Sequence, residues 1–407
     1  YNITITILDP QKDLVQMQAL NAVRISNVGL IILKSETGQK EIPLSHVNAR
    51  LEERDFTNAL INVSRNEIPK VYFLDGHGGR DIDDKDQTTG GHLLKNLLLH
   101  EAYEVEKLLL SQDAPSIPGD ASILIINNYT NDFARYEIAA LDQFIQDGGR
   151  LLVFINPSVK LDQGIASEEQ LRPWLLAKFG IDYLEDIIIT PVGESYDVRA
   201  TLASDFSLLT DEEDPWPNAV EFRGSFHASH PITRNIDVRI DMQQLRTVQL
   251  TDPLPERVTG TTLLRTIPGS WGETDIQALM DERGIAQDPF EAQGPNPVAV
   301  AVTVHTERTT MGDTRAEDAR IVAIGDADST SNQLLGYTGT ADLILNSVAW
   351  LAESEDLIAI RPRGSEGQVL SLTVAEQRGV VWISVLGTLQ VIVLIGILTF
   401  LYRRRYQ

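Results

Sequence analysis

A glycine-rich loop is the first part of the chain where side chains could do chemistry. It follows the apolar segment 71–74 and consists of Asp75, Gly76, His77, Gly78 and Gly79. Glycine permits tight turns and close approach of a ligand to the backbone, and the His77 imidazole could act as a base or as a ligand. The loop matches neither the dinucleotide-binding fingerprint nor a P-loop. It therefore indicates either a structural turn, in which His77 bonds to the backbone, or a ligand site that includes Asp75, Gly76, His77 and Gly78.

A second motif follows another apolar segment late in the chain, and it consists of Asp326, Ala327, Asp328, Ser329 and Thr330. The pattern D-x-D-x-T is the nucleophile motif of haloacid-dehalogenase-type phosphatases, in which the first Asp attacks phosphorus and the second acts as acid and base. That motif normally opens its domain, whereas here it comes late and Gly325 separates it from the strand. Helix capping and turn formation by Asp and Ser is the competing interpretation. A ligand site that includes Asp326 and Asp328 is the binding alternative.

Other polar clusters give weaker signals. One is an acidic loop formed by Asp81, Asp83, Asp84 and Asp86. Calcium prefers such oxygen ligands, but Lys85 takes the fifth position of an EF-hand pattern, which favours a solvated loop. His227 and His230 precede Pro231, and two histidines alone rarely make a metal site. The chain also has no nucleophile elbow and no H-E-x-x-H pair, so we predict no catalytic residues, no metal ion and no cofactor.

The elements that must position these motifs alternate between strand and helix. Apolar runs without alternation at 71–74, 123–126, 151–155 and 321–324 indicate strands buried on both faces, as in parallel sheets. Amphipathic segments at 91–101, 133–147 and 342–352 predict helices between them. The pattern predicts an α/β domain over 69–363, with a Rossmann-like or flavodoxin-like, mostly parallel sheet and β-rich additions. Both motifs follow strands, so they would meet if those strands are neighbours.

The chain ends in a long uncharged segment from Gly379 to Tyr402. A bilayer-spanning helix needs about 20 apolar residues, so the segment predicts a transmembrane helix, with a buried core helix as the competing interpretation. Trp382 and Tyr402 would lie at the two interfaces, and Gln390 could bond to a partner helix. Arg403, Arg404 and Arg405 place the tail 403–407 in the cytoplasm by the positive-inside rule. Residues 364–378 would then be a tether, and the bulk of the chain would be extracytoplasmic.

Composition restricts the possible partners. The 407 residues carry a formal net charge of -24, and 43% of them are hydrophobic. Nucleic acid is excluded as a partner because phosphate binding requires clustered Lys and Arg. The absence of cysteine excludes disulfides and thiol nucleophiles. The chain opens at Tyr1 with an alternating, strand-like segment and no signal peptide, so we expect 1–68 to be a β-rich remnant of a longer N-terminal region.

An ordered set of segments resembles one known family. The segments lie at 57–60, 71–79, 141–157, 179–183, 230–236, 263–275, 320–332, 341–353 and 358–363, and the expected membrane helix at 379–402 completes the set. Their order and spacing resemble the GldG-like family, the auxiliary component of gliding-motility-type ABC transporters. The resemblance implies a soluble domain similar to intraflagellar-transport subunits, an ABC permease and a cytoplasmic ATPase as partners, and no defined catalytic residues. It does not imply gliding motility itself.

Three functions remain open on this basis. The favoured one is a non-catalytic, membrane-anchored, extracytoplasmic subunit of a bacterial ABC-type transport complex at the cytoplasmic membrane, which binds substrate or couples to envelope partners. The second is a structural scaffold in another membrane assembly. The third is a membrane-tethered hydrolase that uses His77 or the pair Asp326 and Asp328.

Overall fold

The computed structural model describes two compact units of the chain, Tyr1–Ile68 with Ile360–Arg363, and Pro69–Ala359 with Gly364–Gln407. The residues described are 4–9, 12–20, 30–35, 39–43, 56, 59–60, 63, 68–157, 170–192, 195–205, 221–275, 287–306, 318–336, 339–353, 382 and 388–405. The segment 364–378, expected to be a tether, lies outside them.

The first unit contains a short helix and a hairpin among its described residues. Helix α1 spans Leu14–Ala19. Strands β1 (Leu30–Lys34) and β2 (Gln39–Pro43) pair antiparallel, with Leu30 opposite Pro43. The four-residue gap between the strands suits a hairpin connection, which usually takes two to five residues.

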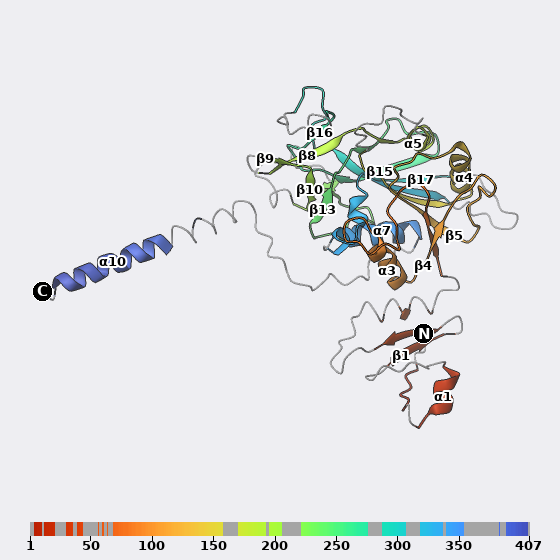
Figure 1. The fold of residues 1–407 in the computed structure, drawn as a ribbon, viewed down its shortest axis with the longest axis horizontal. Coiled ribbons are helices and arrows are strands. Elements are labelled where there is room, and N and C mark those ends of the chain that lie inside the picture. The colour runs from red at the N-terminus through yellow and green to blue at the C-terminus, as the bar shows by residue number, and fades with distance from the viewer. Residues whose placement is uncertain are drawn as a thin grey trace. The chain divides into compact units, whose positions relative to one another are not determined.

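A nine-stranded sheet dominates the second unit (Figure 1). Five strands form its parallel part, namely β3 (Lys70–Leu74), β4 (Glu104–Leu108), β5 (Ala121–Asn127), β6 (Arg150–Phe154) and β18 (Ala319–Ile324). Four strands continue the sheet antiparallel, namely β17 (Pro297–Val304), β15 (Val258–Arg265), β12 (Phe226–His227) and β11 (Phe222–Arg223). The order across the sheet is β11-β12-β15-β17-β18-β6-β5-β3-β4.

The expectation of a mostly parallel sheet was wrong, because the described strands form a mixed sheet. Strand β17 has five consecutive buried residues, like the parallel strand β5, yet it runs antiparallel to β18, with Ala299 opposite Ile324. A continuous apolar run reports burial on both faces and carries no information about strand direction. Direction depends on the connections, which the apolar runs do not reveal.

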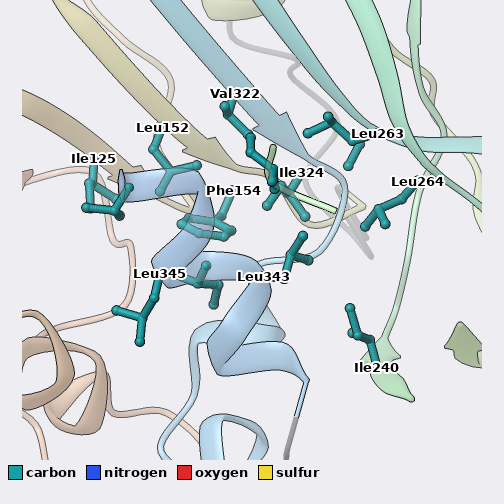
Figure 2. Close-up of a cluster of buried hydrophobic side chains, with 14 of the residues drawn as sticks. Ile125, Leu152, Phe154, Ile240, Leu263, Leu264, Val322, Ile324, Leu343 and Leu345 are labelled. Atoms are coloured by element: carbon teal, nitrogen blue, oxygen red, sulfur yellow. The ribbon is translucent and has the colours of Figure 1, made fainter. Parts of the chain in front are cut away.

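Helices cover both faces of the parallel part. On one face α3 (His92–His100) and α7 (Thr340–Leu351) join a buried cluster with Phe73, Phe154 and Ile324. Figure 2 shows Leu343 and Leu345 of α7 beside Leu152, Phe154 and Ile324. On the other face α4 (Arg135–Gln146) and α5 (Leu171–Phe179) pack in a second buried cluster with Leu124 and Val153. Neighbouring residues of one strand thus enter different clusters, as the strand period of two requires.

Smaller sheets and turns complete the unit. Two of the sheets are strand pairs, β7 (Ile181–Tyr183) with β14 (Val248–Leu250) and β10 (Arg199–Leu202) with β13 (Ile240–Gln243). A third sheet consists of β16 (Trp271–Glu273), β8 (Ile187–Val192) and β9 (Ser195–Asp197). Two 3₁₀ turns, η2 (Asp328–Thr330) and η3 (Leu334–Gly336), follow β18. All of these strand pairings are antiparallel, which again departs from the expectation of a mostly parallel fold.

The prediction of a C-terminal transmembrane helix was also wrong. Helix α10 spans Thr388–Arg405, and its 18 residues include the three arginines of its last turn. Its uncharged part is therefore shorter than the roughly 20 residues that a bilayer requires. None of the helices in the described part of the chain combines the length and apolar character needed to cross a membrane. Trp382, Gln390, Tyr402, Arg403, Arg404 and Arg405 are exposed, while Gly379 lies outside the described residues.

Candidate functional site at the carboxyl edge of the parallel strands

Both motifs identified in the sequence lie where parallel strands end. Across the sheet the parallel strands run β4-β3-β5-β6-β18, so their sequence order is 2-1-3-4-5, as in flavodoxin-like folds. In such folds a ligand binds beyond the carboxyl ends of the strands, where the strand order reverses. Here that switch point lies between β3 and β5. The loop with His77 follows β3, and the segment that begins at Asn128 follows β5.

The chain itself closes the switch point. The backbone N–H groups of Thr130 and Asn131 both donate to the His77 carbonyl, at 2.8 and 3.0 Å. A Cβ atom on Gly78, whose φ is +71°, would lie 2.1 Å from Thr130 Oγ1. A Cβ atom on Gly79 would lie 2.7 Å from the Asn127 carbonyl oxygen. The glycines therefore allow two loops of this chain to pack together, and the room expected for a ligand is taken by backbone.

The His77 side chain contributes to the start of α4. Its ring is buried and stacks on Phe133, with 4.1 Å between centroids. Nδ1 lies 3.1 Å from the Asn131 carbonyl oxygen, and Nε2 lies 3.1 Å from Glu137 Oε1. Glu137 Oε2 accepts the N–H of Ala134, the residue before the helix, at 2.8 Å. Both ring nitrogens thus lie within hydrogen-bond distance of oxygen atoms of the chain, and His77 has a structural role at the start of α4.

Asp326 is a fully buried carboxylate whose oxygens already have donors. Oδ1 accepts the N–H of Asp328 at 2.7 Å and that of Ser329 at 3.1 Å, and Oδ2 accepts the N–H of Gln243 at 2.9 Å. Burial and the neighbouring Asp328 carboxylate raise the pKa of Asp326 to about 7, and these three donors oppose that rise. A nucleophile must reach its substrate, and Asp326 has no exposed surface. Its geometry is that of a turn-forming residue ahead of η2.

Arg80 joins the two motifs and was missed by the sequence analysis. Arg80 Nη2 donates to Asp328 Oδ1 at 2.7 Å, and the guanidinium also bonds to the Thr88 carbonyl. Burial lowers the pKa of Arg80, while Asp328 and then Asp326 oppose the change. Thr330 Oγ1, two residues after Asp328, donates to Asn127 Oδ1 at the end of β5, at 2.7 Å. In the sequence, Arg80 is marked only by its position directly after Gly78 and Gly79, which is a weak signal.

The remaining candidates lie at the edge without converging on a common centre. Asp75 is exposed and accepts the N–H of Gly76 at 2.8 Å. Asp81 and Asp83 pair with Lys107, which lowers the pKa of Asp81 chiefly through that hydrogen bond. Within the described ranges no group of three or more His, Asp or Glu side chains could hold a metal ion.

A family model matches residues 68–352, which contain the whole nine-stranded sheet and α7, and its description is an ABC-type uncharacterized transport system. The chain belongs to this family. The ABC transport family match covers most of the segments that carried the sequence resemblance. It extends to neither the GldG-like subgroup nor gliding motility.

Solved structures with similarity to this ABC transport family member have low identity. The N-terminal domain of mmIFT52 is 12% identical, with 69% of this chain and 97% of that chain covered and a TM-score of 0.44. A ThuA-like protein from Bacteroides uniformis is 12% identical, with 70% of this chain and 91% of that chain covered and a TM-score of 0.37. A ThuA-like protein from Parabacteroides merdae is 11% identical, with 70% of this chain and 90% of that chain covered and a TM-score of 0.36. These similarities carry no functional argument. The comparison with curated proteins gave no match.

Proposed function

We propose that the chain is a non-catalytic auxiliary subunit of an ABC-type transport system that works by contact with its partners. The closed carboxyl edge carries this proposal. Ligand sites of doubly wound folds lie at the switch point, and here the loops after β3 and β5 are hydrogen-bonded to each other across it. His77 after β3 and Asp326 and Asp328 after β18 have partners in the chain, so the edge supports mechanical coupling better than turnover of a substrate.

The expected partners are a permease and a cytoplasmic ATPase, since an ABC transport system contains both. We place the chain at the bacterial cytoplasmic membrane through contact with the permease, with its α/β unit on the extracytoplasmic side. Protease accessibility in spheroplasts tests that side, because cleavage without lysis is expected only for an extracytoplasmic unit.

Purification of the full-length chain from native membranes in mild detergent tests the proposed function. We expect a multi-span permease and an ATPase to co-purify, as identified by mass spectrometry. A chain that elutes alone in several detergents, or with a different membrane complex, would contradict the proposal. A subunit that couples by contact should also change the ATPase rate when it is added back to the purified partners.

Recognition of a small ligand is a second candidate, and one observation favours it. Asn127 Nδ2 and Arg80 Nε are buried N–H groups without an acceptor among the described residues. Burial of an unsatisfied donor costs about 1–3 kcal/mol, so an oxygen atom of a ligand would gain by binding there. Thermal-shift screening with sugars and peptides tests this, since a ligand of the native state raises the melting temperature. Asn127→Leu should abolish such a shift.

A further inference from the structure

A turn that contains two histidines packs beside α7, and we call residues 227–236 the histidine turn. It begins at His227, the last residue of β12, and runs through His230 and Pro231 to Ile236. It includes 230–236, one of the segments that carried the family resemblance, yet the proposed function gives it no role. Ile232 and Ile236 are buried in the same cluster as Trp350 of α7.

Both histidines use Nδ1 as a hydrogen-bond acceptor. His227 Nδ1 accepts the backbone N–H of His230 at 3.0 Å, and His230 Nδ1 accepts the backbone N–H of Ile232 at 3.2 Å. Arg234 N donates to the His230 carbonyl at 2.9 Å, so the His230 side chain caps a single turn with proline in its first position. An imidazole can accept through Nδ1 only while that nitrogen carries no proton. The folded turn therefore requires both rings to be neutral.

Other contacts also hold the histidine turn on the unit, among them the backbone bond from Ala228 N to the Glu221 carbonyl at 2.8 Å and the burial of Ile232 and Ile236. Asn346 Nδ2 of α7 donates to the Ile232 carbonyl at 2.9 Å, and Arg223 Nη2 donates to the Ile236 carbonyl at 2.6 Å. Thr233 Oγ1 donates to the His227 carbonyl at 2.7 Å within the turn. The His230 ring lies 5.2 Å from the Trp350 ring. The two histidine caps thus act together with these contacts, and they are the bonds of the turn that protonation of a histidine ring would remove.

The charged groups around the two rings mostly oppose their protonation. Burial lowers the pKa of His230 to about 4, with further lowering by His227, by Arg320 of β18 and by Arg234. Burial also lowers the pKa of His227, against the opposing effect of Glu221, whose Oε1 lies 3.6 Å from Nε2. The other charged groups nearby belong to the elements packed against the turn, namely Arg223 with Asp237, Arg265 over Phe222, and Glu353 beside Arg320.

We propose that the histidine turn is an acid-sensitive cover on α7. Protonation of His227 and His230 removes the two lone pairs that bind the N–H groups of His230 and Ile232. The positive charges then face Arg320 and Arg234, while the Glu221 carboxylate offsets part of the charge on His227. The turn lifts, and the apolar side chains of Ile232, Ile236 and Trp350 become available to solvent or to a partner.

Hydrogen–deuterium exchange of the full chain between pH 7 and pH 4.5 tests this proposal, after correction for the pH dependence of intrinsic exchange. We expect protection of the peptide 228–236 to fall at least about tenfold, because a proton bound only by the open form shifts the opening equilibrium about tenfold per pH unit. The peptide 121–127 of β5 should keep its protection and reports global unfolding. Equal loss in both peptides, or none in 228–236, would overturn the proposal.

The matched variant is His227→Asn with His230→Asn. An Asn Oδ1 atom can accept the same N–H groups, as N-cap residues do, but cannot take up a proton in this range. We expect the variant to keep protection in 228–236 at pH 4.5, and loss equal to the wild type would overturn the proposal. If the variant does not fold, an NMR titration of the wild-type His227 and His230 Cε1–H signals decides, because the proposal requires their shifts to change together with exchange in 228–236.

Discussion

Arg80 and Asp328 are 248 positions apart in the sequence, and Arg80 Nη2 lies 2.7 Å from Asp328 Oδ1. The contact joins the loop after β3 to the turn after β18, and β5 and β6 lie between these two strands in the sheet. Both side chains are largely buried, at 9% and 25% exposure. The ion pair therefore ties the first and last strands of the parallel part together in an environment that water screens only in part.

A double-mutant cycle on this pair should give a clear coupling energy. We expect Arg80→Ala and Asp328→Ala to be coupled by about 1–3 kcal/mol, since removal of one partner leaves a partly buried charge unpaired. The measurement is urea unfolding of the two single variants, the double variant and the wild type. Arg199 and Asp197 form the control pair, because they also approach to 2.7 Å but the Arg199 side chain is 69% exposed. Their coupling should stay below about 1 kcal/mol, and equal coupling in the two cycles would contradict the argument.

Gly78 should tolerate no side chain. Its φ of +71° is in the left-handed region, and a Cβ atom would lie 2.1 Å from Thr130 Oγ1. We expect Gly78→Ala to destabilise the chain by about 2–4 kcal/mol, from strain and from separation of the loops after β3 and β5. Gly119→Ala is the control, because a Cβ atom there would meet nothing within 4 Å. Thermal unfolding compares the two variants, and similar melting temperatures would mean that the two loops can separate without cost.

The sequence predicted individual helices and buried strands well, but it predicted strand direction and contacts between distant residues poorly. Apolar periodicity placed a helix at 91–101 and another at 342–352, and the structure has α3 at His92–His100 and α7 at Thr340–Leu351. The antiparallel direction of β17 could not follow from a run of apolar residues that looks the same in either direction. The Arg80–Asp328 contact depends on the order of five strands, and neither side chain carries a sign of its partner. Likewise, the closure of the switch point depends on turn geometry around Gly78 and Thr130.

Arg246 should be among the least replaceable side chains. It is 1% exposed, and its guanidinium donates from Nε to the Leu184 carbonyl at 2.7 Å and from Nη1 to the Asn156 carbonyl at 2.9 Å. It also lies 4.8 Å from the centroid of the Tyr183 ring. We expect Arg246→Met to cost about 3–5 kcal/mol, because it leaves the part-buried carbonyls of Leu184 and Asn156 without these donors.

Arg246→Lys separates charge from geometry. A lysine ammonium has no planar fork to reach both carbonyls at once, so we expect it to recover less than half of the loss in urea unfolding. Full recovery by lysine would mean that charge alone matters at this position. Recovery by methionine would mean that the two carbonyls find other donors.

Asp326 should make stability depend on pH in a direction opposite to that of most carboxylates. Its pKa is raised from 3.8 to about 7 by burial and by Asp328, so the folded chain binds more protons than the unfolded chain between these values. The stabilisation is complete below about pH 4 and is lost as the pH rises through 7.

We expect the unfolding free energy of the wild type, relative to Asp326→Asn, to fall by on the order of 3 kcal/mol between pH 4.5 and pH 8. Because both chains contain His227 and His230, the difference cancels their titration. Urea unfolding at several pH values measures it, with the exposed Asp113→Asn as control. A difference independent of pH would show that the three N–H donors keep Asp326 ionised throughout.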